Sequence, residues 1–202
     1  MTMFDASPER QNDRRQDERP TAEAAEEAAV AEVVAGCQAG IRESRRLLYE
    51  RFHASMYRLL ARMVGEQDAP DLVQDVFLQV YAKIGQFAGQ SRFTTWLYRL
   101  ATNIALQHLR TARRHRTALL DTDPEDVHGA GGQTSEQQEL LQTALQRIDP
   151  QLRAIFLLRE LEGQSYRDIA LALDIAEGTV GSRLNRARRE LKEHLAALGW
   201  EG

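Results

Sequence analysis

Apolar residues recur at helical spacing along most of this chain, and runs that alternate apolar and polar residues, as strands do, are absent. The first clear stripe lies between residues 47 and 63 and consists of Leu47, Leu48, Phe52, Met56, Leu59, Leu60 and Met63. Gly65 is expected to end this helix, because glycine readily adopts the left-handed conformation found at helix C-termini. The pattern predicts an all-α protein.

Two further helices are predicted in the same part of the chain. Asp68 and Pro70 are typical of a helix start, with the aspartate as cap and the proline in the first turn. The expected buried face of this helix is Leu72, Val73, Val76, Phe77, Val80, Tyr81 and Ile84. The loop FAGQSRF then leads into FTTWLYRLATNIALQHLRTARR, whose inward-facing residues are expected to be Phe93, Leu97, Leu100 and Ile104.

Composition divides the chain into four parts. Residues 1–35 are predicted to be an acidic, largely disordered extension, whose Ala/Glu-rich stretch, capped by Thr21, forms a helix only where a partner covers it. Residues 36–116 form a first small helical domain, and residues 117–135 form a flexible linker that contains proline, paired glycines and acids. Residues 136–202 form a second small helical domain with the expected core residues Leu140, Leu141, Leu145, Ile148, Ile155, Phe156, Leu158 and Leu161.

The segment from Ser165 to Leu195 predicts two helices joined by a tight turn at Asp174. The second helix carries its apolar residues on one stripe, namely Val180, Leu184, Ala187, Leu191 and Leu195. Its opposite face is polar and cationic and holds Thr179, Ser182, Asn185, Arg186 and Arg189. This arrangement is typical of a helix-turn-helix whose second helix enters the major groove of DNA. An ordinary helical hairpin with a solvated basic face is the alternative.

Composition and charge limit the possible functions. The formal net charge is -4, so DNA binding has to come from locally basic segments such as 110–116 and 183–192. The lone Cys37 has no partner for an internal disulfide, and it is interpreted as a packing residue of a cytoplasmic protein. The histidines do not have the spacing of metal ligands. The sequence contains no nucleophile–base arrangement and no glycine-rich phosphate loop that would indicate an enzyme. No signal peptide is visible, and no apolar stretch is long enough to span a bilayer.

Two surfaces of the first domain are candidates for binding. The helix after Pro70 is expected to expose Asp71, Gln74, Asp75 and Leu78 opposite its buried stripe. A leucine among carboxylates indicates a protein-docking patch, and a solvated acidic face is the alternative. The segment 87–116 interleaves aromatic residues with cations and amides, as the binding of single-stranded DNA requires. Phe93 is interpreted as core, and Trp96 as a core-edge residue that is also able to contact DNA.

Three segments of the chain together resemble the extracytoplasmic-function (ECF) sigma factors of bacterial RNA polymerase. They are LYERFHASMYRLLARMVG, DAPDLVQDVFLQVYAKIGQFAGQSRFTTWLYRLATNIALQHLR and IDPQLRAIFLLRELEGQSYRDIALALDIAEGTVGSRLNRARREL, and the resemblance extends from about Leu47 to Leu195. The first two segments resemble sigma region 2 and the third resembles sigma region 4. The middle segment is the most specific, because few other families join DLVQDVFL to TWLYRLATN.

The resemblance implies an alternative sigma factor that binds core polymerase, recognises a promoter and helps to melt its −10 element, without covalent chemistry or a cofactor. It implies that Asp71, Gln74, Asp75 and Leu78 dock on the beta-prime clamp helices. It assigns −10 DNA binding to Arg92, Trp96, Arg99, Asn103, His108, Arg110, Arg113 and Arg114. It assigns the −35 element to Thr179, Ser182, Arg183, Arg186, Arg188 and Arg189, with Arg188 and Arg189 on the DNA backbone. The implied partners are core polymerase through its beta-prime and beta subunits, promoter DNA and an anti-sigma factor.

The chain departs from the family pattern at two positions of the helix-turn-helix. Asp174 stands where the turn usually has glycine, and aspartate tolerates the left-handed conformation at some cost. Gly181 stands where the family often has a lysine or arginine, which removes a potential DNA contact. A conventional helix-turn-helix regulator that binds duplex operators as a dimer is the alternative function, and it would bind symmetric DNA sites without polymerase.

Overall fold

The computed structural model describes residues 22–119 and 136–200, and every regular element in these ranges is a helix. The first range contains α1 (Ala22–Gln38), α2 (Arg42–Val64), α3 (Ala69–Lys83), the short 3-10 helix η1 (Ile84–Gln86) and α4 (Phe93–Leu119). The second range contains α5 (Glu136–Arg147), α6 (Pro150–Glu160), α7 (Tyr166–Leu173) and α8 (Glu177–Ala197). The prediction of an all-α fold is confirmed.

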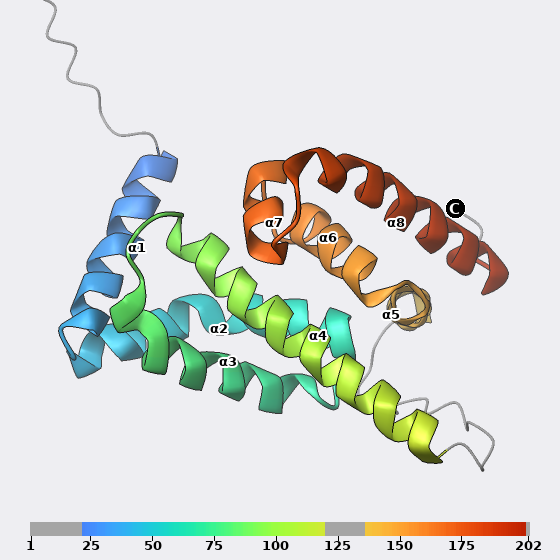
Figure 1. Ribbon diagram of the computed structural model, residues 1–202, viewed down its shortest axis with the longest axis horizontal. Coiled ribbons are helices and arrows are strands. Elements are labelled where there is room, and N and C mark those ends of the chain that lie inside the picture. Colours follow the sequence, from blue (N-terminus) through green and yellow to red (C-terminus); the bar gives the residue numbers. More distant parts are fainter. Residues whose placement is uncertain (1–21, 120–135, 201–202) are drawn as a thin grey trace, which may run out of the picture.

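The first domain packs α2, α3 and α4 side by side, and α1 stands across one end of this layer (Figure 1). Its core contains the fully buried side chains of Leu48, Met56, Leu59, Leu60, Met63 and Leu97. Gly65 ends α2 as predicted, but with a φ of 104° and a ψ of 159° it does not adopt the left-handed helical conformation. Leu47 was expected on the buried stripe but is 40% exposed.

The N-terminal boundary requires a correction. Residues 22–35 were predicted to belong to a largely disordered extension, but they form most of α1, and their apolar residues Val30 and Val34 are buried. The partner that covers this Ala/Glu-rich helix is α2 of the same chain. Cys37 is buried in the same contact, where burial raises the pKa of its thiol. Thr21 and the rest of the predicted extension lie outside the described residues.

The second domain packs α6 and α7 against α8, with α5 across the end of α8 (Figure 1). Leu145, Ile148, Ile155 and Leu158 are buried as predicted. Leu161 is 41% exposed, which corrects its assignment to the core. The predicted linker falls partly on α4, which continues to Leu119, and otherwise on residues outside the described ranges.

The two domains pack directly against each other, chiefly through α4 and α7 and through α2 with α5 and α6. Arg153 on α6 is 3% exposed and donates hydrogen bonds to the carbonyl oxygens of Met63, Gln146 and Ile148. Burial lowers the pKa of Arg153 to about 10. Because the Met63 carbonyl lies at the end of α2, this buried guanidinium joins the first domain to the second.

Candidate nucleic-acid interface

The helix-turn-helix of the second domain is built by its local sequence. Ser165 caps α7 by accepting a hydrogen bond from the backbone N–H of Asp168. Asp174 ends α7 in the left-handed conformation, with a φ of 54° and a ψ of 51°, as the turn requires. Val180 and Leu184 on α8 are fully buried and hold this helix against α6 and α7. The opposite side of α8 is left on the surface of the domain.

The outer surface of α8 carries most of the residues predicted to bind DNA. Ser182, Arg186, Arg188 and Arg189 are exposed, whereas Thr179 and Arg183 are partly exposed. Arg186 Nε lies 2.7 Å from Glu190 Oε1, and this hydrogen bond raises the pKa of Arg186. Arg188 turns toward α6, where its Nη2 lies 2.5 Å from Glu160 Oε1. The structure therefore separates Arg188 from Ser182 and Arg186, which share one face.

The predicted docking face lies on α3 with all of its members exposed, namely Asp71, Gln74, Asp75 and Leu78. Leu78 is 59% exposed, the largest value among the exposed large hydrophobic residues of the described part. All four side chains are therefore accessible to a partner, as the docking prediction requires.

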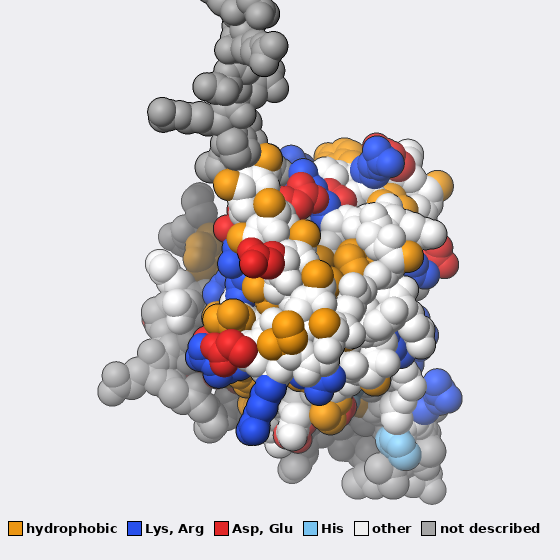
Figure 2. Space-filling view, turned by 90° about the vertical axis from the view of Figure 1, so that its left-hand side faces the viewer, with side chains coloured by type: hydrophobic (Ala, Val, Ile, Leu, Met, Phe, Trp, Pro, Cys, Tyr) orange, Lys and Arg blue, Asp and Glu red, His pale blue; other side chains and the backbone are white. Residues whose placement is uncertain are grey.

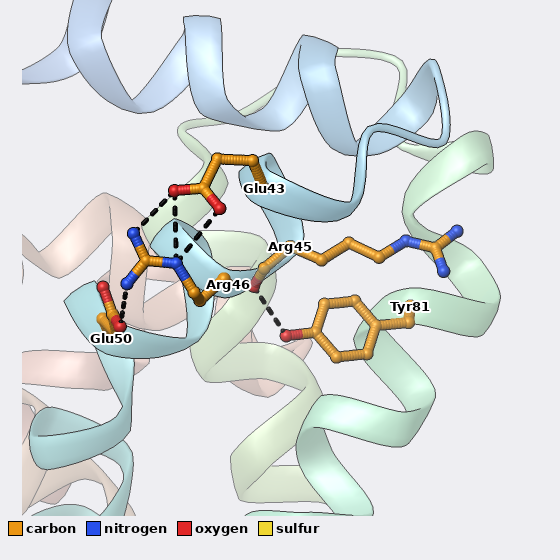
Figure 3. Close-up of polar contacts among 5 residues, drawn as sticks. All are labelled: Glu43, Arg45, Arg46, Glu50 and Tyr81. Carbon is orange, nitrogen blue, oxygen red and sulfur yellow. Dashed lines mark hydrogen bonds and ion pairs between the residues drawn. The ribbon is translucent and has the colours of Figure 1, made fainter.

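The orientation of α3 is fixed by its contacts with α2. The Tyr81 hydroxyl donates a hydrogen bond of 2.9 Å to the carbonyl oxygen of Arg45, and the Arg45 guanidinium lies 5.9 Å from the centre of the Tyr81 ring (Figure 3). Burial raises the pKa of Tyr81. On α2, Arg46 bridges Glu43 and Glu50, as Figure 3 also shows. Sequence reasoning missed the contact between Tyr81 and Arg45 because these residues lie on two separate helices.

An aromatic cluster lies at the start of α4, next to the loop that precedes it. The Phe93 ring centre lies 5.6 Å from the ring centres of both Phe87 and Trp96. Phe93 is 5% exposed and belongs to the core, and Trp96 is partly exposed at the edge of that core. Both observations agree with the interpretation of these residues from the sequence.

One face of α4 gathers most of the residues predicted to bind −10 DNA. Arg92, Arg99, Asn103, Arg110, Arg113 and Arg114 are all exposed. His108 does not share this face. Its Nε2 lies 2.9 Å from Asp68 Oδ2, so its imidazole faces the start of α3. Asp68 was predicted to cap α3, but its side chain makes no capping hydrogen bond and contacts His108.

Sequence reasoning also missed a carboxylate beside the predicted DNA face. Arg92 Nε lies 3.4 Å from Glu27 Oε1 on α1, and Arg51 pairs with Glu26 of the same helix. Figure 2 looks onto this side of the molecule and shows acidic and basic side chains next to one another. The acidic composition of residues 22–32 indicated that this segment could form ion pairs, but it did not reveal which arginine residues would be the partners.

Within residues 22–119 and 136–200, no group of three or more His, Cys, Asp or Glu side chains is arranged to hold a metal ion. None of the described helices combines the length and the hydropathy that crossing a membrane requires.

Comparison with known proteins places this architecture in a class. The family model described as "Sigma-70 region 2" matches residues 48–115, which cover most of α2, all of α3 and most of α4. The family model described as "Sigma-70, region 4" matches residues 138–191, which include the helix-turn-helix. The fold and its exposed basic helix are thus those of a transcription initiation factor of the sigma-70 class.

Individual relatives narrow this class. The "ECF RNA polymerase sigma-E factor" of Haemophilus influenzae is 37% identical over 80% of this chain and 92% of its own length. The Escherichia coli K12 protein of the same name is 34% identical over 80% of this chain and 91% of its own length. The chain belongs to the family of ECF RNA polymerase sigma factors.

Solved structures show the same fold. The sigma factor RpoE of Bartonella quintana, in complex with the anti-sigma factor NepR, aligns with a TM-score of 0.65 and 25% identity over 75% of this chain and 96% of its own. CnrH, in complex with the cytosolic domain of CnrY, aligns with a TM-score of 0.63 and 22% identity over 82% of this chain and 96% of its own.

Proposed function

We propose that this sigma factor binds core RNA polymerase through α3 and reads a promoter through α4 and α8. One observation carries this assignment. The same chain has a basic polar face on each of its two domains and an exposed Leu78 beside carboxylates. A duplex-binding regulator needs only one of these surfaces.

In this proposal α8 lies in the major groove at the −35 element. Ser182 and Arg186 face the bases or the adjacent phosphates, with Thr179 and Arg183 at the edges of the contact. Arg189 contacts the DNA backbone. Arg188 also contacts the DNA backbone. To do so, its guanidinium has to leave Glu160 and bind a phosphate instead.

The loop before α4 and the exposed face of that helix bind the −10 element. Trp96 offers a partly exposed ring for a base to stack on, and Asn103 offers an amide for a base edge. The cations Arg92 and Arg99 neutralise the phosphates of the separated strand, and Arg110, Arg113 and Arg114 bind the adjacent duplex. His108 contributes by holding the start of α3 through Asp68.

Docking involves the beta-prime clamp helices of the polymerase and the face of Asp71, Gln74, Asp75 and Leu78. The beta subunit is a further partner. The chain itself performs no catalysis, requires no cofactor and acts in the cytoplasm, where polymerase and promoter DNA are found. An anti-sigma factor is a further partner, as for the Bartonella quintana sigma factor solved together with NepR.

Run-off transcription tests this function. Purified bacterial core polymerase and genomic fragments are incubated with the wild-type chain, with Asp75→Arg or without added protein. New discrete transcripts that require the wild-type chain, and that Asp75→Arg reduces, are the expected result. Absence of such transcripts together with tight binding to symmetric duplex sites without polymerase would instead favour the dimeric regulator.

A further inference from the structure

A polar cavity of about 510 Å³ lies between the two domains. One wall is the loop before α4, with Gln90, Ser91 and Arg92, and the other comes from the end of α6, the α6–α7 turn and α7. Its volume falls within the range of sites that hold small ligands, roughly 300–1,000 Å³. The functional surfaces described above do not include the second-domain side of this cavity.

The charges that line this cavity are mainly positive. Three guanidinium groups, those of Arg92, Arg159 and Arg167, contribute to the lining, together with a single carboxylate, Asp168. Asp168 is already engaged, because its Oδ1 accepts a hydrogen bond of 2.9 Å from Thr95 and its Oδ2 accepts one of 2.5 Å from Ser165. Three guanidinium groups against this one carboxylate give the lining an excess of positive charge.

The cations differ in how firmly they are held. Arg159 donates a hydrogen bond of 2.8 Å to the Gln164 carbonyl and lies 5.5 Å from the centre of the Tyr166 ring, which fixes the direction of its guanidinium. Arg92 makes an exposed ion pair with Glu27, a kind of contact that is weak in water. Arg167 is exposed and makes no hydrogen bond or ion pair within the described part of the chain.

We propose that this interdomain cavity binds a small oligophosphate anion through Arg92, Arg159 and Arg167. Guanidinium groups recognise phosphate oxygens through paired, charge-assisted hydrogen bonds, and Ser91 and Gln90 supply neutral polar groups nearby. The phosphates come from a free nucleoside polyphosphate or pyrophosphate, or from a nucleic-acid backbone. Because the lining belongs to both domains, a bound anion stabilises their packed arrangement.

The test is calorimetric titration of the full chain with inorganic pyrophosphate at constant ionic strength, without polymerase. The wild-type chain is expected to bind in the millimolar range or tighter. Arg167→Gln is expected to weaken binding about tenfold, the loss of one charge-assisted contact. Arg147→Gln, which removes an exposed charge on α5 outside the cavity, serves as the matched control and is expected to bind like the wild type.

Two results would overturn the proposal: no heat beyond that of a sulfate titration, or an equal loss of affinity in Arg167→Gln and Arg147→Gln. Competition by a single-stranded oligonucleotide separates the two sources of phosphate. Displacement of pyrophosphate that depends on Arg167 assigns the site to a nucleic-acid backbone, whereas pyrophosphate binding without displacement assigns it to a free anion. The titration contains no polymerase, so a failure to bind pyrophosphate can be distinguished from a failure of the proposed function in the transcription assay.

Discussion

The Tyr98 hydroxyl on α4 donates a hydrogen bond of 2.5 Å to Oε2 of Glu162, which lies just after α6. Ser55 on α2 donates a second hydrogen bond of 2.7 Å to the same oxygen. Glu162 thus ties its domain to both central helices of the other, while its buried Oε1 has no partner within the described residues. Hydrogen-bond donors that face a buried carboxylate stabilise the contact, because a buried charge has little water to replace them.

Tyr98→Phe is expected to destabilise the chain by about 1–3 kcal/mol at neutral pH, because it leaves the Glu162 carboxylate with one donor fewer. Burial, followed by the hydrogen bond to Glu162, raises the pKa of Tyr98 well above its usual value. The folded chain therefore holds the phenol proton more tightly than the unfolded chain. The associated stability is complete below about pH 10 and is lost as the pH rises further. Urea unfolding at neutral and alkaline pH measures both effects.

The difference in stability between wild type and Tyr98→Phe should narrow above about pH 10. Tyr166→Phe is the control, since Tyr166 is 40% exposed and its hydroxyl makes no hydrogen bond within the described residues. A constant difference across the pH range would contradict the assigned cause of the shift.

Arg153→Met is expected to lower the free energy of unfolding by about 2–4 kcal/mol, because three carbonyl oxygens lose a shared donor. Arg153→Lys should restore little of this stability, because an ammonium group cannot reproduce the fork of a guanidinium. Urea unfolding checks both variants against Arg147→Met, whose exposed side chain should change stability by less than about 0.5 kcal/mol. Full rescue by lysine would show that charge alone matters at this position.

The helices and their ends were largely predictable from local sequence. The spacing of apolar residues predicted α2, α3, α4 and α8, and the left-handed Asp174 followed from its place in a helix-turn-helix. These features depend on residues within one or two turns of each other. The sequence also predicted correctly that Phe93 is buried and that Leu78 is exposed.

Contacts between distant segments were not predictable in the same way. The Ala/Glu-rich stretch was predicted to form a helix only where a partner covers it, but the thin apolar face of α1 gave no sign that α2 would be that partner. Sequence reasoning also did not anticipate that the helical phase of His108 turns it from Asn103 toward Asp68. Likewise, Arg188 follows Arg186 by two positions and points to Glu160.

Gly181→Ala is expected to stabilise the chain by about 0.5–1 kcal/mol, because glycine inside a helix costs conformational entropy. An added methyl group would meet the Tyr166 ring at 3.5 Å, an ordinary van der Waals contact. Gly163→Ala is the matched comparison and should destabilise the chain, since Gly163 has a φ of +63° with nothing near its missing side chain. Thermal unfolding of both variants checks the opposite signs.

Asp75→Arg is expected to weaken binding to core polymerase by at least about tenfold, because it reverses a charge in the centre of the α3 face. The fold should be unaffected, since this side chain is exposed. Glu32→Arg on α1 makes the same change of charge on another exposed surface and should bind normally. Affinity is measured with labelled sigma factor and purified core enzyme, and equal affinities of the two variants would remove α3 from the docking surface.

Arg186 and Glu190 provide the sharpest test of the −35 contact, because the carboxylate competes with DNA for the guanidinium. With core polymerase present, Arg186→Ala should lower promoter affinity and reduce the slope of log affinity against log salt by about one. Glu190→Gln should raise promoter affinity, since it frees Arg186 and removes a negative charge next to the phosphates. The two changes should not be additive, because the gain from Glu190→Gln depends partly on Arg186. A salt slope that Arg186→Ala leaves unchanged would place this residue away from the phosphates.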